Sequence, residues 1–154
     1  MSTSVTMIKG DIFNTSCIAV VNPVNTVGIM GKGLALQFKI RYPEMFVDYQ
    51  ARCKAGHVQV GIPYVYNNPT YNKFIVNFPT KDHWVNPSKI EWINSGLEYL
   101  VKKVRSGQWG SLSTIAFPLL GAGCGGLDQT EVLDSMKMWL SMLPANVNTE
   151  IYYL

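Results

Sequence analysis

The sequence predicts an α/β protein in which a mixed central sheet of about six strands lies between two layers of helices. Short runs rich in β-branched and aromatic residues recur along the chain, and helical patterns separate most of them. The runs are SVTMI, CIAVV, IPYVYN, KFIVNF, STIAFPLL and TEIYYL. CIAVV and TIAFPLL are almost wholly apolar, which is typical of strands buried on both faces. Together these patterns predict a three-layer α/β/α sandwich.

The composition narrows the class of protein. A chain of 154 residues, 47% apolar and 15% charged, is suited to one compact domain over residues 1–154. The net charge of +3 is spread along the chain, which argues against a strongly basic nucleic-acid clamp. Three cysteines and two histidines lie far apart without a CxxC pair, so we predict a reducing compartment, no metal site and no cofactor. Without a secretory signal or an apolar run of roughly 18 residues, we expect a cytoplasmic monomer without a membrane span.

Apolar residues at helical spacing predict two long helices in the second half of the chain. One runs from Ile90 to Val104, and Ser88 with Glu91 has the spacing of a capping box at its start. The other begins after Asp128, where DQTE repeats the capping spacing ahead of a further apolar stripe. Both helices are expected to pack their apolar stripes on the sheet.

The predicted order of elements points to the place where a ligand binds. The segment from Gly33 to Lys54 should form two short helices, because Pro43 interrupts the helical hydrogen bonds. The order is then β, β, α, β, β, α, β, α, β. Open α/β sheets bind ligands at the carboxyl ends of their strands. We therefore expect function in the loops that leave Val21, Phe78 and Leu120.

The segment GAGCGG, Gly121 to Gly126, lies between a predicted buried strand and the helix that follows Asp128. Glycines let main-chain amides approach an anion, and the N-terminus of the next helix adds a partial positive charge. The spacing also matches GxGxxG, but a dinucleotide-binding domain places that motif near its beginning. A tight turn that requires positive φ angles is the alternative, and both interpretations stay open.

Polar residues follow two other predicted strands. Asn22 and Asn25 can donate and accept hydrogen bonds, which suits ribose hydroxyls, although asparagine is also common in turns. The nearby GKG is not a nucleotide triphosphatase loop, because Gly33 stands where a hydroxyl must bind magnesium. In NFPTKDHW, Lys81 taken alone is best interpreted as a solvated surface charge.

Four motifs in this order resemble the macrodomain family, whose α/β/α modules bind ADP-ribose. They are KGDIF, NPVNTVGIMGKGLALQF, NFPTKDHW and PLLGAGCGGLD, and they span nearly the whole chain. Within the family, the chain is similar to the branch of the terminal ADP-ribose glycohydrolase and the antitoxin DarG, with DarG the nearer. The resemblance implies an ADP-ribosyl glycohydrolase that acts on ADP-ribosylated DNA, at thymidine, or on acidic protein side chains. It also implies a cognate ADP-ribosyltransferase toxin as a partner.

Two other functions stay open for such a chain. Many macrodomains bind ADP-ribose without turnover, so a non-catalytic binding module is the first alternative. A phosphatase acting on ADP-ribose 1″-phosphate is the second, although Cys124 lacks the CxxxxxR pattern of a phosphatase nucleophile.

The resemblance also implies roles for individual residues. It places adenine near Asp11, the distal ribose near Asn25, and the diphosphate at the glycine-rich segment. Lys81 becomes the catalytic candidate, able to attack or polarise the C1 carbon of the distal ribose, and Asp128 is a weaker one that also suits a helix cap. Tyr152 or Tyr153 could stack on adenine or pack in the core. The predicted ligand-binding set is Asp11, Ile12, Asn22, Thr26, Val27, Gly28, Met30, Gly31, Lys32, Gly33, Leu120, Gly121, Ala122, Gly123, Cys124, Gly125 and Gly126.

Overall fold

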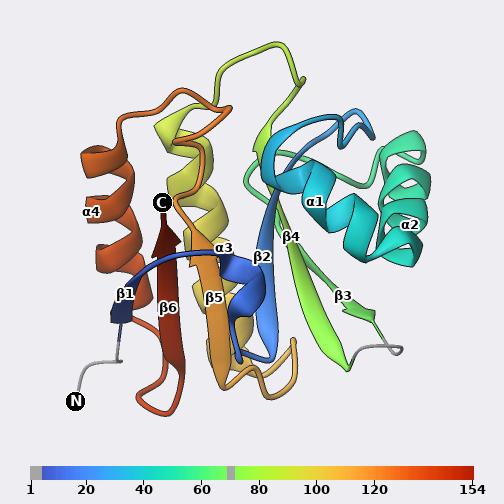
Figure 1. Ribbon diagram of the computed structural model, residues 1–154. Helices are drawn as coiled ribbons and strands as arrows, with labels where there is room; N and C mark the ends of the chain where they lie inside the picture. Colours follow the sequence, from blue (N-terminus) through green and yellow to red (C-terminus); the bar gives the residue numbers. More distant parts are fainter. Residues whose placement is uncertain (1–4, 69–71) are drawn as a thin grey trace.

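The computed structural model describes residues 5–68 and 72–154, and these form one sheet with helices on both faces (Figure 1). The strands are β1 (Val5–Lys9), β2 (Ala19–Asn25), β3 (Tyr64–Asn68), β4 (Lys73–Lys81), β5 (Thr114–Pro118) and β6 (Asn148–Tyr153). They lie side by side in the order β1-β6-β5-β2-β4-β3. β3 is antiparallel to β4, and the other paired strands are parallel. The predicted mixed sheet is confirmed.

The helices lie where the apolar patterns predict them. They are α1 (Gly33–Arg41), α2 (Pro43–Lys54), α3 (Ile90–Ser106) and α4 (Gln129–Leu140). Pro43 is in the first turn of α2, where its missing N–H costs no helical hydrogen bond, so the predicted break is confirmed. The sequence pattern does not predict the short 3-10 helix η1 (Ile12–Asn14). Asp11 caps η1, since its carboxylate accepts a hydrogen bond from Phe13 N at 2.9 Å.

Apolar clusters fill the space on both faces of the sheet. One contains residues of α3 and α4, and the other contains residues of η1, α1 and α2. The central strands β2, β4 and β5 are buried along most of their length, which confirms the prediction from their apolar sequences. α3 approaches β4 closely because Gly96 has no side chain; a Cβ there would lie 2.3 Å from the ring of Phe78.

The two predicted helix caps have different outcomes. Asp128 is the N-cap of α4 and accepts a hydrogen bond from Glu131 N at 3.0 Å, as predicted. The predicted capping box of α3 is wrong, because α3 starts at Ile90 with Lys89 as its N-cap. Ser88 is instead drawn into a tertiary contact, in which its N–H donates to Gly125 O at 2.9 Å. Local spacing alone could not reveal that competing partner.

Candidate active site

A cleft of about 890 Å³ opens at the carboxyl ends of the parallel strands. Its lining comes from parts of five segments at strand ends and from Gln129 at the start of α4. The segments are residues 10–12 after β1, 152–154 at the end of β6, 118–125 from the end of β5 onward, 23–35 from the end of β2 onward, and 80–84 at the end of β4. Since these strands are consecutive in the sheet in the order β1, β6, β5, β2 and β4, the cleft runs across the sheet edge from β1 to β4. The cleft lies at the edge where the sequence predicts it.

The structure brings many of the predicted site residues to this cleft. Those in its lining are Asp11, Ile12, Asn25, Gly31, Lys32, Gly33, Lys81, Gly121, Ala122, Gly123, Cys124 and Gly125. Those outside its lining are Asn22, Thr26, Val27, Gly28, Met30, Leu120, Gly126 and Asp128. Asn22, Met30 and Leu120 are almost completely buried, so their side chains support the walls instead of facing the cleft.

The asparagine loop, residues 25–33, leaves β2 and is held by the side chain of Asn25. The Oδ1 atom of Asn25 accepts hydrogen bonds from Val27 N at 3.1 Å and from the Tyr49 hydroxyl at 2.7 Å. Its Nδ2 atom donates to Ile29 O at 2.8 Å. Burial raises the pKa of Tyr49 far above its ordinary value, so the hydroxyl remains a donor. These bonds fix which side of the Asn25 amide is the acceptor.

Asn22 lies on the same strand but connects strands within the core. It is fully buried, and its Nδ2 atom donates to Asn77 Oδ1 on β4 at 3.1 Å. The Nδ2 atom of Asn77 in turn donates to the hydroxyl of Tyr64 on β3 at 3.1 Å. Burial raises the pKa of that hydroxyl. This polar chain joins three adjacent strands behind the cleft.

The glycine loop, residues 121–126, is held mainly by its own main chain. Leu127 N donates to Gly121 O at 2.9 Å, and Gly126 N donates to Gly123 O at 3.1 Å. Gly121 and Gly126 have φ angles of 73° and 77°, so the loop makes a tight turn with positive φ, which does not exclude an anion at its main-chain amides. At Gly125, a Cβ would lie 2.3 Å from Gly121 O, which leaves no room for any side chain. The loop lines the cleft with Gly121, Gly123, Gly125 and the small side chains of Ala122 and Cys124.

Lys81 ends β4 and is only 8% exposed, so its interpretation as a solvated surface charge is wrong. Its Nζ atom donates to Trp84 O at 3.1 Å, and the residue lines the cleft. Asn25 and Lys81 are register partners on the neighbouring strands β2 and β4, next to an irregularity between Val24 and Asn25. The sheet thus places the Asn25 side-chain amide beside the nearly buried Lys81 at the β4 end of the cleft.

The β1 and β6 end of the cleft contains an acid and two tyrosines. Asp11, Tyr152 and Tyr153 all contribute to the lining. The Tyr152 hydroxyl donates a hydrogen bond to Glu150 Oε1 at 2.8 Å, which restrains the orientation of the Tyr152 ring. Thr15 Oγ1 donates to the same Glu150 oxygen at 2.7 Å. This end offers flat apolar rings and a carboxylate, the groups that suit an adenine base.

Among the residues that shape the cleft and that sequence reasoning missed are Tyr49 and Trp84. Tyr49 lies on α2, and its hydrogen bonds to Asn25 arise only when α2 packs on the sheet, so no local signal marks them. Trp84 lines the cleft while remaining 46% exposed. The motif NFPTKDHW contains Trp84, and a large aromatic residue directly after a strand end is the signal that could have identified it.

The described residues contain neither a group of metal-binding side chains nor a membrane-spanning helix. Residues 5–68 and 72–154 contain no group of three or more histidine, cysteine or acidic side chains placed to hold a metal ion. Within the same ranges, no helix combines the length and the apolar character that a membrane-spanning segment requires. Cys17, Cys53 and Cys124 are free thiols.

A six-stranded α/β/α sandwich whose ligand cleft crosses the carboxyl ends of its parallel strands defines a class of small-molecule-binding modules. The Macro domain family model matches residues 21–136 of this chain. The chain belongs to the Macro domain family, and the resemblance inferred from the four motifs is confirmed.

Individual relatives agree with this assignment. Over 146 residues, 94% of this chain, it is 43% identical to a Mycobacterium tuberculosis protein named DNA ADP-ribosyl glycohydrolase, and it spans 40% of that protein's length. The solved macrodomain of Mycobacterium tuberculosis DarG superposes with a TM-score of 0.91 at 42% identity, covering 99% of both chains. The structure of Thermosipho africanus DarTG in complex with ADP-ribose superposes with a TM-score of 0.89 at 31% identity, covering 99% of this chain and 43% of the other.

Proposed function

We propose that this chain binds ADP-ribose in the cleft and hydrolyses the bond between its distal ribose and a modified macromolecule. ADP-ribosylated DNA, modified at thymidine, is the proposed substrate. The observation that carries the proposal is the pairing of Asn25 with the nearly buried Lys81 at one end of a cleft that crosses the sheet edge. The names of the mycobacterial and Thermosipho relatives support both the ligand and the DNA substrate.

The order of the strands supports one direction for the ligand. Adenine is assigned to the β1 and β6 end, where Asp11, Ile12 and Tyr152 line the cleft. The diphosphate then meets the glycine loop after β5, whose main-chain amides suit an anion. The distal ribose reaches the asparagine loop after β2 and Lys81 on β4. Because the strands are neighbours in this order, the linear ligand crosses them one after another.

The proposed chemistry takes place at C1 of the distal ribose. The bond from C1 to the DNA breaks and its electron pair leaves with the DNA, while water supplies a hydroxyl group to C1 and a proton to the departing DNA base. Lys81 acts either as a deprotonated amine that attacks C1, to be displaced later by water, or as an ammonium that stabilises the negative charge developing on the departing DNA base. Its hydrogen bond to Trp84 O directs the Nζ atom within the cleft wall. Asp128 lies outside the cleft lining and has no assigned step, since its carboxylate caps α4.

The decisive experiment measures released ADP-ribose after incubation with ADP-ribosylated single-stranded DNA. We expect complete release by the wild-type protein and release slowed by about 10³-fold in Lys81→Ala. A parallel reaction with protein carrying ADP-ribose on acidic side chains distinguishes the second substrate class. Intact substrates in both reactions, together with tight ADP-ribose binding, would identify a non-catalytic binding module instead.

Ligand binding has an independent measurement. Free ADP-ribose at a hundredfold excess over Kd should stabilise the fold by about 2.7 kcal/mol, because it binds only the folded state. The melting temperature is measured with and without the ligand, and with ribose 5-phosphate as the control. Absence of a shift at millimolar ADP-ribose would contradict the assignment of the cleft.

The proposed reaction also implies how its substrate arises. An ADP-ribosylated base must be made by an ADP-ribosyltransferase, so we propose that a transferase toxin produces the substrate of this chain. Protection of DNA by this chain in the presence of such a transferase is the direct test.

A single domain over residues 1–154 and a monomeric state stay predictions. Analytical ultracentrifugation measures the oligomeric state.

A further inference from the structure

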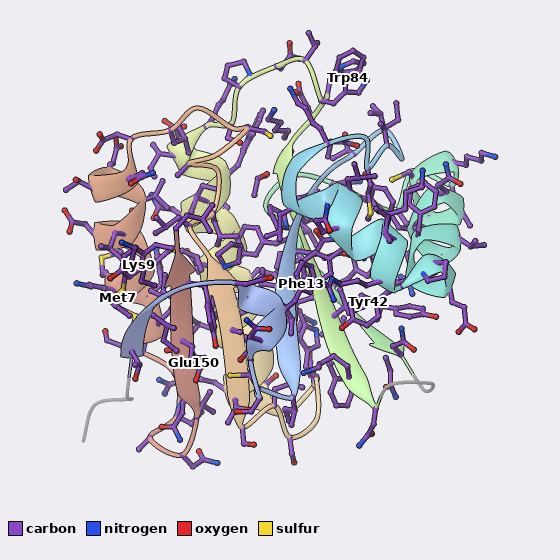
Figure 2. The ribbon with its side chains drawn as sticks, in the orientation of Figure 1. Met7, Lys9, Phe13, Tyr42, Trp84 and Glu150 are labelled. Carbon is purple, nitrogen blue, oxygen red and sulfur yellow. The ribbon has the colours of Figure 1, made fainter. Side chains whose placement is uncertain are left out.

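Trp84 places a large flat ring in solvent beside the cleft. It is 46% exposed and also lines the cleft, and Figure 2 shows it on the loop that links β4 to α3, pointing away from the body of the molecule. Exposing an aromatic ring to water forgoes the stabilisation that burial supplies. An exposed tryptophan at the rim of a ligand cleft is therefore a candidate contact for whatever extends beyond the cleft.

Hydrogen bonds hold the loop that carries Trp84 in one conformation. Thr26 Oγ1 on the asparagine loop donates to Asp82 O at 2.6 Å. The Asp82 carboxylate accepts from His83 N at 2.7 Å and from Asn86 Nδ2 at 3.2 Å. His83 Nδ1 accepts from Val85 N at 3.2 Å. A ring carried by a fastened loop loses little conformational freedom on binding a partner.

The position of Trp84 relative to Lys81 identifies what passes over it. Lys81 donates to the main-chain carbonyl oxygen of Trp84, and Trp84 lines the cleft, so Trp84 adjoins the end of the cleft where C1 of the distal ribose is assigned. The macromolecule attached at C1 must leave the cleft at this end. The cations in the cleft lining are Lys32 and Lys81. The nearby Asp82 carboxylate stays ionised, because hydrogen bonds from Asn86 Nδ2 and His83 N lower its pKa. The positive charge that would meet a polyanion at this end therefore comes from Lys32 and Lys81.

We propose that the indole of Trp84 stacks on a nucleobase next to the ADP-ribosylated nucleotide of a single-stranded nucleic acid. The inference rests on the proposed function and adds a contact outside the ADP-ribose site. Every nucleobase has a flat face, so stacking selects single-stranded nucleic acid without selecting a sequence. A duplex keeps its bases stacked on one another and cannot offer that face. Trp84 would thus favour a modified single-stranded nucleic acid over an isolated modified nucleoside.

The test compares two substrates in the same variants. One is an ADP-ribosylated single-stranded oligonucleotide, and the other is the ADP-ribosylated mononucleoside. We expect Trp84→Ala to raise the ratio of the oligonucleotide KM to the nucleoside KM by about tenfold, the lower range for one lost base stack. Trp84→Phe should restore most of the difference, since phenylalanine keeps a flat ring. Val85→Ala, at an exposed residue of the same loop outside the cleft lining, is the matched control.

Other results would overturn the inference. An unchanged KM ratio in Trp84→Ala means that the ring contacts no base. An equal rise in KM for ADP-ribosylated protein means that Trp84 meets any macromolecule, and not a nucleic acid in particular. If the wild-type protein cleaves neither substrate, the proposed function fails while stacking is still measured. Quenching of tryptophan fluorescence by unmodified single-stranded DNA with ADP-ribose present must then be larger in wild type than in Trp84→Phe, and equal quenching contradicts the inference.

Discussion

The asparagine loop and the glycine loop meet in the cleft but are built in opposite ways. The first is fastened by side chains, with Asn25 bonded to Val27, Ile29 and Tyr49. The second is fastened by main-chain bonds and excludes a side chain at Gly125, where a Cβ would collide with Gly121 O. The loops come so close that a Cβ on Gly33 would lie 3.1 Å from Cys124 Sγ.

The difference follows from what each loop is proposed to hold. A ribose has hydroxyls at defined angles, and an oriented amide recognises them through direction. A diphosphate spreads its charge over several oxygens, so it needs a close approach by many main-chain N–H groups. We therefore expect ligand binding and stability to suffer in the asparagine loop when hydrogen bonds are removed, and in the glycine loop when side-chain volume is added.

The largest effect is expected for Lys81, the register partner of Asn25. Lys81→Ala should lower kcat by about 10³-fold, the scale of a lost electrostatic contact in a transition state. The Kd of ADP-ribose, measured by calorimetry, should change little, because the contacts assigned to the ligand lie in other loops. Strong residual activity in Lys81→Arg indicates an electrostatic role, since arginine remains charged, and full activity in Lys81→Ala contradicts the catalytic assignment.

In the glycine loop, a larger side chain on the side that faces the ligand is expected to weaken ADP-ribose binding. At Gly123 a Cβ would meet nothing within 4 Å, so Gly123→Val should fold normally. The added branch obstructs the approach of the diphosphate and should weaken ADP-ribose binding by about 2 kcal/mol, roughly thirtyfold. Calorimetry measures the affinity and melting temperature checks the fold. Unchanged affinity in the folded variant moves the anion site away from this loop.

A side chain added at Gly125, which faces Gly121 and Ser88, should lower the free energy of unfolding. Gly125→Ala places a Cβ 2.3 Å from Gly121 O and 2.5 Å from Ser88 Oγ, so the loop must shift. We expect a loss of about 1–2 kcal/mol in the free energy of unfolding, measured by urea denaturation. Gly123→Ala is the matched control, because it adds the same methyl group to open space. Equal stability of both variants would show that the loop is not tightly packed.

The asparagine loop is expected to be less stable when the Tyr49 hydroxyl that supports it is removed. Tyr49→Phe removes the donor to Asn25 Oδ1 and should cost about 1 kcal/mol, roughly 2–4 °C in melting temperature. The same change should weaken ADP-ribose binding, since the Asn25 amide loses one restraint. Tyr99→Phe on α3 serves as the control. A variant with wild-type affinity would show that the remaining bonds suffice to orient the amide.

The smallest effect concerns pH at the β6 end. Burial alone would raise the pKa of Glu150, but hydrogen bonds from Thr15 and Tyr152 hold it below its ordinary value of 4.5. A carboxylate with a lowered pKa stabilises the fold above its unfolded pKa and loses that contribution as pH falls through the folded pKa. Wild type should therefore exceed Glu150→Gln in melting temperature near neutral pH, and the gap should shrink in acid. A gap independent of pH would contradict this assignment.

Much of the fold and the rough location of the site could be predicted from local sequence. Apolar runs mark strands, Pro43 marks the break between α1 and α2, and Asp128 marks the start of α4. The motifs that identify the family also lie at strand ends. The capping box at Ser88 failed because its main chain bonds to Gly125, a partner far along the chain. Such competition is invisible to any rule based on spacing.

The sequence by itself determined the strands, the four α-helices, the family and three of the loops that line the cleft, because these depend on periodicity and on short motifs. Only the tertiary structure decided which side chains face that cleft. Asn22 and Asn25 are equivalent in type and three positions apart, yet packing buries the first among strands and sets the second in the lining. Likewise, the solvent-exposed charge expected of Lys81 becomes a nearly buried cation beside Asn25. Burial and register arise from contacts between segments distant in the chain, so no single segment encodes them.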